Sequence, residues 1–259
     1  MAFDTARFAE LIQRRGVSLG QPLYAVESTG STNDDAMAAA RAGAPHGATF
    51  LAEEQTRGRG RRGSRWSSQP GESLTFSVLL RARLPHERMS ALTLAIGLAV
   101  REAVARRVSS TIRIKWPNDI VAAEGRRKLA GILLESQVQG ADVAALVVGI
   151  GLNVGMRRFE AELSDTATSL ALLEASDLDR ESLLADVLFE LEARFSSYER
   201  SGLSAMLGEL RAHDALLGTL VKSDQASGIA RGIDEQGALV LETPEGSLVR
   251  VVSGSISPG

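Results

Sequence analysis

The stretch KLAGILLESQVQGADVAALVVGIGLNV, residues 128–154, decides the fold of this 259-residue chain. It contains two apolar segments, at 128–138 and 144–154, on either side of the polar, glycine-containing sequence QGAD. Apolar runs that are bounded by turn residues are typical of strands buried on both faces. We therefore expect the two segments to pair as a hairpin with its turn at QGAD.

Upstream of this hairpin, helical and strand patterns alternate along the chain. The spacing of apolar residues predicts helices at 4–15, 32–40 and 88–107. Thr32 and Asp35 stand at the positions of a capping box, which would open the second helix. Strand patterns occur at 23–26, 49–53, 74–80 and 112–115. The third of these strands alternates apolar and polar residues, as a half-buried strand does.

Downstream, the pattern changes from helices to short strands. Helices are expected at 180–200, with one apolar face, and at 203–213. From Gly218 onward, four to five short strands are separated by turn clusters within about forty residues, which favours a small barrel. We therefore expect an α+β domain at 1–214 and a small all-β domain at 215–259.

Composition excludes several classes of function. The chain has no cysteine, so disulfides, thiolate zinc sites and a cysteine nucleophile are excluded. The three histidines, His46, His86 and His213, show no metal-binding spacing. The longest apolar run, 143–150, is far shorter than the roughly 20 residues that span a bilayer, and the first residues lack a signal-peptide core. We expect a cytoplasmic protein that does not enter a membrane.

The segment RGRGRRGSR, residues 57–65, combines five arginines and three glycines with no acidic residue. Glycines let a backbone wrap closely around a ligand, and arginines suit phosphate and carboxylate oxygens. The alternatives are a solvated loop or a nucleic-acid-binding tract. A net charge of −3 and a single nearby aromatic residue, Trp66, argue against nucleic acid. Because five like charges repel, we predict a mobile lid that an anionic ligand orders.

Lysine is rare in this chain, with only Lys115, Lys128 and Lys222 among 29 basic residues. In KWPND, residues 115–119, proline ends a strand and presents an amide and a carboxylate beside a lysine. Such a group suits a phosphate and Mg²⁺, although a plain polar turn is the alternative. Lys128 leads into a buried strand, where it would reach a carboxylate or an α-phosphate unless it lies in solvent.

Two glycines, Gly149 and Gly151, interrupt the apolar strand GIGLN. Glycine weakens a strand unless something must approach its backbone closely, and a flat ligand such as an adenine or a bicyclic ring would do so. Neither a Rossmann nor a P-loop interpretation of this strand is supported, because GIGLNV lacks the third glycine of GxGxxG and the sequence contains no GxxxxGK[ST] motif.

Five motifs together resemble the biotin–protein ligase family in their order and spacing: STN at 31–33, EEQTRGRGRRGSRW at 53–66, KWPNDI at 115–120, KLAGIL at 128–133 and GIGLNV at 149–154. The resemblance covers roughly residues 23–259. It implies a mixed sheet with flanking helices, like the catalytic domain of class II aminoacyl-tRNA synthetases, followed by an SH3-like barrel. It also implies that ATP and Mg²⁺ activate biotin to biotinyl-5'-AMP, and that a lysine of a biotin carboxyl carrier protein, such as that of acetyl-CoA carboxylase, accepts the biotinyl group.

The resemblance further implies roles for individual residues. Catalysis would depend on Lys128, Arg61 and Lys115. Biotin would contact Ser31, Thr32, Asn33, Gln55, Arg59, Gly60, Arg61 and Lys128. The nucleotide would contact Arg61, Arg62, Trp66, Lys115, Asn118 and Asn153. Asp119 would be a ligand of Mg²⁺.

One departure from the family and two alternatives complete the sequence-based expectations. About twenty residues precede the region of resemblance, too few for a helix-turn-helix domain, so we expect a ligase without repressor activity or DNA binding. We expect a monomer or a weak homodimer. The alternatives are a lipoate-type protein ligase on a related fold and an arginine-glycine nucleic-acid-binding module; octanoyl transferases that depend on cysteine are excluded.

Overall fold

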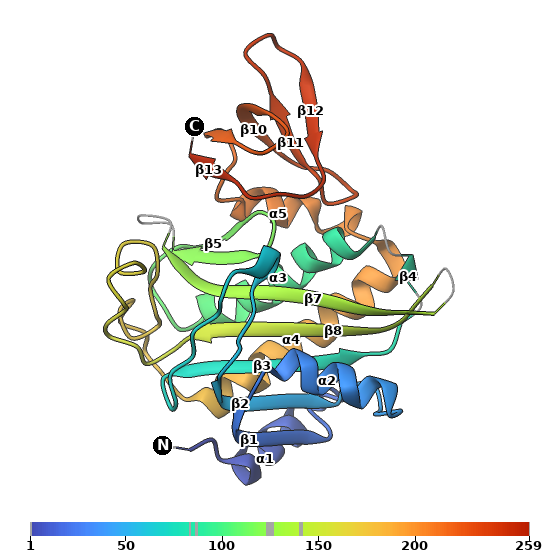
Figure 1. Cartoon of the computed structure of the whole chain (residues 1–259), viewed down its shortest axis with the longest axis vertical. Helices are drawn as coiled ribbons and strands as arrows, with labels where there is room; N and C mark the ends of the chain where they lie inside the picture. The colour runs from blue at the N-terminus through green and yellow to red at the C-terminus, as the bar shows by residue number, and fades with distance from the viewer. Residues whose placement is uncertain (1, 83, 86–87, 123–126, 140–141, 259) are drawn as a thin grey trace.

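The computed structural model describes residues 2–82, 84–85, 88–122, 127–139 and 142–258 (Figure 1). Its larger part is an eight-stranded mixed sheet in the order β1-β2-β3-β8-β7-β6-β5, with β4 paired to β8. The pair β1–β2 is parallel, and the other pairs are antiparallel. The strands are β1 (Leu23–Thr29), β2 (Thr49–Gln55), β3 (Ser73–Leu80), β4 (Leu84–Pro85), β5 (Ile112–Lys115), β6 (Asp119–Ala122), β7 (Lys128–Gln139) and β8 (Asp142–Asn153).

The hairpin expected at 128–154 is confirmed as the pair β7–β8, which extends from Ala130 opposite Leu152 to Gln139 opposite Asp142, with a shift of register between Gln137 and Val138. The apolar residues of β8 from Ala145 to Leu152 are buried because β3 and β7 flank this strand and helices cover the sheet, whereas Leu133 and Leu134 of β7 are only partly buried. The expected turn at QGAD includes residues 140–141, which lie outside the described residues.

Helices cover both faces of the sheet (Figure 1). On one face, α3 (Met89–Ala105) and α4 (Arg180–Ser201) pack on the large core, with α1 (Thr5–Arg15) against α4. On the other face lies α2 (Thr32–Arg41), which buries small residues against β3 and β8. The short helix α5 (Leu207–His213) leads to the second sheet. No helix in the described ranges is long and apolar enough to cross a membrane.

The helix α2 begins where the sequence predicts, but the expected capping box is wrong. The N-cap is Ser31, and its side chain makes no capping hydrogen bond. The backbone N–H of Thr32 instead donates to Gln55 Oε1 of β2 at 2.8 Å. The hydroxyl of Thr29 donates to Asp35 Oδ2 at 2.7 Å. Tertiary partners therefore satisfy the groups that a local cap would have used.

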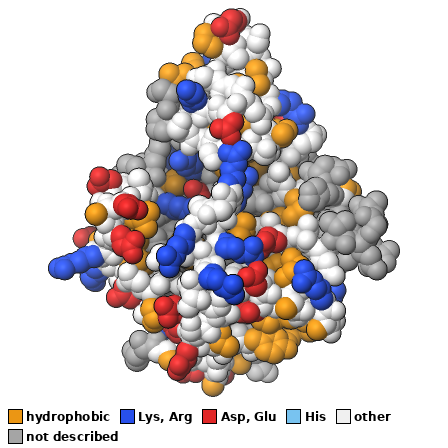
Figure 2. Space-filling view, in the orientation of Figure 1, with side chains coloured by type: hydrophobic (Ala, Val, Ile, Leu, Met, Phe, Trp, Pro, Cys, Tyr) orange, Lys and Arg blue, Asp and Glu red, His pale blue; other side chains and the backbone are white. Residues whose placement is uncertain are grey.

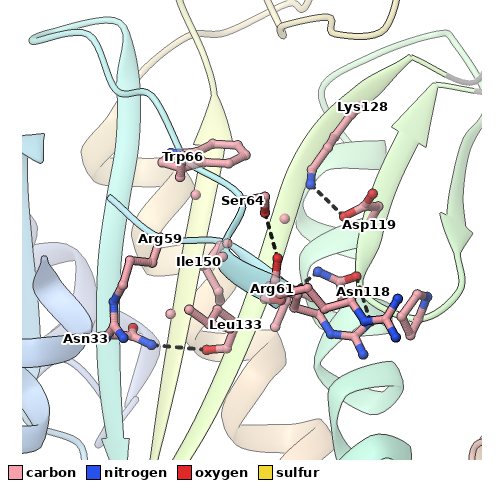
Figure 3. A pocket seen from close by; sticks show the side chains of 18 of the residues that line it. Asn33, Arg59, Arg61, Ser64, Trp66, Asn118, Asp119, Lys128, Leu133 and Ile150 are labelled. Atoms are coloured by element: carbon pink, nitrogen blue, oxygen red, sulfur yellow. Dashed lines mark hydrogen bonds and ion pairs between the residues drawn. The ribbon is translucent and has the colours of Figure 1, made fainter. Parts of the chain in front are cut away.

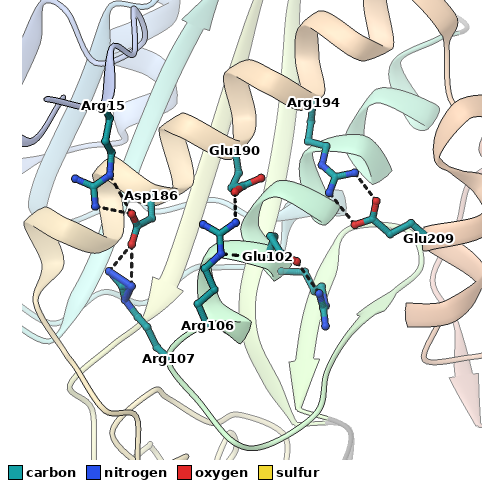
Figure 4. Close-up of polar contacts among 9 residues, drawn as sticks. Arg15, Glu102, Arg106, Arg107, Asp186, Glu190, Arg194 and Glu209 are labelled. Atoms are coloured by element: carbon teal, nitrogen blue, oxygen red, sulfur yellow. Dashed lines mark hydrogen bonds and ion pairs between the residues drawn. The ribbon is translucent and has the colours of Figure 1, made fainter. Parts of the chain in front are cut away.

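Ion pairs fix α4 to its neighbours (Figure 4). Asp186 binds Arg15 at 2.6 Å and Arg107 at 2.7 Å, while Glu190 pairs with Arg106. The apolar face expected on this helix is confirmed, since its residues at helical spacing are buried in the large core: Leu184, Val187, Leu188, Leu191, Phe195 and Tyr198. The helix thus combines a buried apolar stripe with charged residues that meet α1 and α3.

The C-terminal residues form a five-stranded antiparallel sheet in the order β12-β11-β10-β9-β13. Its strands are β9 (Leu220–Lys222), β10 (Ser227–Ile233), β11 (Leu239–Glu242), β12 (Leu248–Val251) and β13 (Ser257–Pro258). The buried indole of Trp116 donates a 2.9 Å hydrogen bond to the carbonyl of Gly237. The small sheet therefore sits on the end of the larger one, beside the KWPND turn (Figure 1).

Candidate active site

A row of residues that runs across five strands forms the floor of a cavity on the α2 face of the sheet. In backbone register, the row runs through Thr75, Gly151, Gly131, Asp119 and Lys115. Neighbouring strands lie about 4.8 Å apart, so the row extends for nearly 20 Å across the sheet. The cavity above it has a volume of about 540 Å³. Its floor is uncharged at one end and carries a carboxylate and an ammonium group at the other.

Two glycines of this floor make room for side chains of the chain itself. A Cβ atom at Gly149 would lie 2.2 Å from Asn33 Oδ1, and one at Gly151 would lie 2.2 Å from Trp66 Cε2. The expectation that these glycines leave space for a flat ligand directly on the strand is therefore wrong. Asn33 and Trp66 occupy those positions and form the inner surface of the cavity.

Gly151→Ala is expected to displace the indole of Trp66, because the added methyl group has no room beside it. The emission maximum of tryptophan fluorescence should shift to longer wavelength, since the chain has only two tryptophans and the other, Trp116, is buried and hydrogen-bonded to the carbonyl of Gly237. Gly208→Ala is the matched control, because a Cβ there meets no atom within 4 Å. An unchanged emission spectrum in Gly151→Ala would contradict the close approach of the indole to β8.

At the uncharged end, a buried hydrogen-bond network joins α2 to β2 and β3. Gln55 Oε1 accepts two hydrogen bonds from Thr32, one from the hydroxyl at 3.1 Å and one from the backbone N–H at 2.8 Å. The hydroxyl of Ser77 lies 2.7 Å from Thr32 Oγ1 and 2.6 Å from Asn33 Oδ1. These side chains are buried. They can offer donors and acceptors in fixed positions to a polar, uncharged group.

The sequence did not identify the polar face of β3 as part of the site. The prediction of a half-buried strand is wrong, since all eight residues of β3 are buried. Ser73, Thr75 and Ser77 point to the side of the sheet that carries the cavity, and Thr75 lines it. The sequence does contain three hydroxyl residues at alternate positions of this strand. Alternation shows only that they share one face, and it does not show whether that face meets solvent or a cavity.

At the charged end, Lys128 Nζ lies 2.7 Å from Asp119 Oδ1 and 5.7 Å from the centre of a Trp66 ring (Figure 3). Asn118 donates from Nδ2 to the carbonyl of Ile132 at 2.9 Å and accepts from Arg61 at 3.4 Å. Burial lowers the pKa of Arg61, against the attraction of Asp119, which raises it. Since a guanidinium stays protonated, Arg61 is a partly desolvated cation and favours an anionic ligand.

The arginine-glycine segment 57–66 forms a compact flap that crosses in front of β8 and β7 (Figure 1). Gly60 N donates to the carbonyl of Ser64 at 2.7 Å, which closes the loop. Arg59 pairs with Asp34 at 2.6 Å and Glu135 at 3.1 Å, whereas Arg62 pairs with Asp224 of the small sheet domain at 2.7 Å. Figure 2 shows basic side chains gathered across the middle of this face. Ordering of the flap by a ligand stays a prediction.

A second cavity of about 510 Å³ adjoins the first. The two share a wall that contains Trp66, Lys115, Asp119 and Lys128. Beyond this wall the second cavity is largely apolar, with Met156, Phe159, Leu163 and Val221 among its lining residues. No sequence motif pointed to the segment around 156–167 as part of the site. The lysines thus stand where two separate ligands would meet.

The structure brings the candidate site residues together. Thirteen of the fourteen line the first cavity: Ser31, Thr32, Asn33, Gln55, Arg59, Gly60, Arg61, Arg62, Trp66, Lys115, Asn118, Asp119 and Lys128. Asn153 lines the second cavity instead, and its side chain donates to the carbonyl of Thr168 at 2.9 Å. Their individual roles stay predictions.

Comparison with known proteins identifies related families over both parts of the chain. Residues 26–153 match the Biotin/lipoate A/B protein ligase family, and residues 219–259 match the Biotin protein ligase C terminal domain. A biotin–[acetyl-CoA-carboxylase] ligase of Mycobacterium tuberculosis is 37% identical over 246 residues, which cover 90% of this chain and 88% of that protein. The bifunctional ligase/repressor BirA of Bacillus spizizenii is 33% identical over 247 residues, which cover 93% of this chain and 75% of that protein.

A solved structure has a similar fold. The biotin protein ligase from Aquifex aeolicus, in complex with biotin and ATP, superimposes with a TM-score of 0.77 and 30% identity. The superposition covers 91% of this chain and 97% of that one. Both sheets thus have counterparts in a protein of known structure.

Proposed function

This chain belongs to the biotin protein ligase family, and we propose on that premise that it activates biotin with ATP and transfers the biotinyl group to a lysine of a biotin carboxyl carrier protein. The chain is a ligase, as are its relatives. The observation that carries the proposal is the position of Lys128 and Lys115 in the wall between two cavities. An acid in one cavity and a nucleotide in the other would meet at these two cations.

Biotin fits the first cavity in one orientation. Its ureido group offers two N–H donors and a carbonyl acceptor, which suit the network of Thr32, Asn33 and Gln55, where Asn33 Nδ2 also donates to Glu135 Oε2 at 2.7 Å. Its carboxylate would then reach Lys128 at the opposite end. The remaining contacts that we propose come from Ser31 and from the flap residues Arg59, Gly60 and Arg61.

The nucleotide would place its adenine in the second, more apolar cavity and its phosphates at the shared wall. Arg61, Lys115 and Asn118 would hold the phosphates, with Trp66 and Asn153 nearer the nucleoside. Arg62 also lines the first cavity, but its guanidinium is directed to Asp224. Its contribution to phosphate binding therefore requires that this ion pair open.

The two steps of the reaction need no enzyme nucleophile. A carboxylate oxygen of biotin attacks the α-phosphorus of ATP, a new O–P bond forms, and the bond to the pyrophosphate oxygen breaks. Lys128 and Lys115 stabilise the charge that builds up on the phosphate oxygens. The lysine amine of the carrier then attacks the acyl carbon, loses a proton and expels AMP. Between the steps, the flap would keep water from the mixed anhydride.

Mg²⁺ would enter with the nucleotide. Within the described residues, no group of three or more histidine or acidic side chains could hold a metal ion. A magnesium ion on a triphosphate needs only one or two carboxylates, so Asp119, beside Asn118 at the shared wall, fits this limited role. The ion supplies neutralisation of the phosphate charge, and Asp119 would have to divide its contacts between the ion and Lys128.

The larger domain and the small C-terminal domain would have different roles. We assign catalysis to residues 1–214 and closure of the cavity rim to residues 215–259, because Gly254, Ser255 and Ile256 line the first cavity. Expectations of a cytoplasmic location, of no DNA binding and of a monomer or weak homodimer stay predictions. Analytical ultracentrifugation of the purified chain tests the last of these.

Exchange of labelled pyrophosphate into ATP tests the proposed function. Exchange should require both the purified chain and biotin, since only formation of biotinyl-5'-AMP makes the first step reversible. Lipoate in place of biotin should give no exchange above background. Exchange with lipoate alone would support the lipoate-type ligase, while salt-dependent oligonucleotide binding without exchange would support the nucleic-acid module.

A further inference from the structure

Two buried polar atoms at the first cavity have no hydrogen-bond partner among the described residues. They are Oγ1 of Thr75 and Nε1 of Trp66. Thr75 is only 3% exposed. A buried hydroxyl or indole N–H without a partner is unfavourable, and in native proteins such groups usually meet a ligand or an ordered water.

The neighbours of Thr75 on the same face of β3 do have partners. The hydroxyl of Ser73 accepts from Gln69 N at 3.0 Å, and the hydroxyl of Ser77 contacts Thr32 and Asn33. The middle hydroxyl of this row is thus the exception. Valine has the same shape as threonine and would fill this position without the unpaired oxygen.

Both unpaired atoms lie beside Gly151. Thr75 is paired in register with Gly151, so its side chain is on the same face of the sheet. The Cβ position of Gly151 is 2.6 Å from Trp66 Nε1. Along β3, Thr75 is two residues, about 6.7 Å, from Ser77 at the uncharged end. Across the sheet, two strand spacings, about 9.6 Å, separate Thr75 from Gly131, which lies beneath Lys128. The unpaired groups therefore lie between the two ends of the cavity.

We propose that Thr75 and Trp66 form a subsite for the ring sulfur of biotin. This inference rests on the proposed function, in which the ureido group and the carboxylate already have partners at the two ends. The one remaining heteroatom of biotin is the thioether sulfur, which is a weak hydrogen-bond acceptor. An indole N–H donates only, and a hydroxyl can donate, so both groups suit an acceptor atom between the ends.

Thr75→Val removes the hydroxyl and keeps the shape, and Thr75→Ser keeps the hydroxyl. The measurement is the dissociation constant, by calorimetry, of three ligands with sulfur, oxygen or a CH₂ group at the ring position: biotin, oxybiotin and carbobiotin. Thr75→Val should weaken biotin about fivefold and oxybiotin about tenfold, because oxygen is the stronger acceptor, and leave carbobiotin unchanged. Thr75→Ser should retain the preference of the unmodified chain.

The melting temperature of the ligand-free protein gives a second readout. Thr75→Val should melt at the same or a higher temperature, since it removes an unpaired buried hydroxyl, although it binds biotin less tightly. Trp66→Phe removes the second donor, the indole N–H, and is tested with the same three ligands. It provides an independent test of the subsite if Thr75→Val does not fold. It should also weaken biotin and spare carbobiotin.

Two results would overturn the subsite. One is an equal loss of affinity for all three ligands, and the other is no loss for any of them. If the unmodified chain bound none of the three ligands, the proposed function itself would fail, which is a different result. Selective loss for the sulfur and oxygen ligands supports the subsite.

Discussion

Lys128→Ala is expected to slow biotin-dependent exchange of pyrophosphate into ATP by about 100- to 1,000-fold, the usual cost of removing a group that stabilises transition-state charge. Lys128 Nζ stands in the wall shared by the two cavities. There it would neutralise both the carboxylate and the α-phosphate, which otherwise repel each other. The variant also leaves the carboxylate of Asp119 without its cation, 2.7 Å away, where two anions must approach.

Lys222→Ala is the matched control for this prediction. Lys222 belongs to β9, and it is not among the residues that line either cavity. Its replacement should leave the exchange rate unchanged. Near-normal exchange in Lys128→Ala alone would show that the role assigned to this lysine is wrong.

Glu53→Gln is expected to destabilise the folded chain by about 3 kcal/mol, as breaking a buried ion pair does. Glu53 of β2 accepts from both terminal nitrogens of Arg180, at 2.7 and 2.9 Å. It also accepts from the backbone N–H groups of Phe3 and Gly71. The substitution would put a neutral amide in place of the carboxylate that faces the buried guanidinium of Arg180, 7% exposed, which also donates to the carbonyl of Ser73 at 3.2 Å. Denaturant unfolding measures the loss.

Glu10→Gln is the control for this variant, because Glu10 forms an ion pair with Arg14 on the surface of α1, where both side chains are mostly exposed. Such a pair contributes at most about 1 kcal/mol. A loss in Glu53→Gln no larger than in Glu10→Gln would contradict the importance of the buried pair.

The same carboxylate predicts how stability depends on pH. Burial raises the pKa of Glu53, but hydrogen bonds and attraction from Arg180, with the backbone of Gly71 and Phe3, outweigh this and lower it. A lowered folded-state pKa means that the stabilisation is present above the unfolded value of about 4.3 and is lost as the pH falls through the folded value. The unmodified chain should therefore lose more stability than Glu53→Gln as the pH falls below about 4.

The order of helices and strands could be predicted because apolar periodicity reflects burial. The hairpin β7–β8 and the stripe on α4 are cases in which a local pattern and the tertiary environment agree. Residue types that suit anions identified the flap, Lys115 and Lys128 one by one, but their convergence was expected only from the resemblance to the biotin–protein ligase family.

The contacts within the site could not be predicted, because they join positions far apart in sequence. Nothing local shows that Gly149 accommodates Asn33 or that Gly151 accommodates Trp66. Likewise, Glu53 lies in the motif that resembles the ligand-binding segment, yet its side chain joins the N-terminal region to α4. A polar residue in a strand predicts that its side chain faces away from the hydrophobic core. Whether that side chain then meets solvent, a cavity or another element depends on the tertiary structure.

The ion pairs that tie down the flap are weak ones, and this has a kinetic consequence. Arg59 and Arg62 and their partners Asp34 and Asp224 are each more than 40% exposed, and Glu135, the second partner of Arg59, is 30% exposed. Water and dissolved salt screen such charges, so each pair adds little to the barrier against opening. We expect ion pairs of this strength to break spontaneously and often, so that the flap opens without a ligand or partner. We therefore expect the lifetime of bound biotinyl-5'-AMP to shorten as the ionic strength rises, and we expect the flap to open without help from the carrier protein.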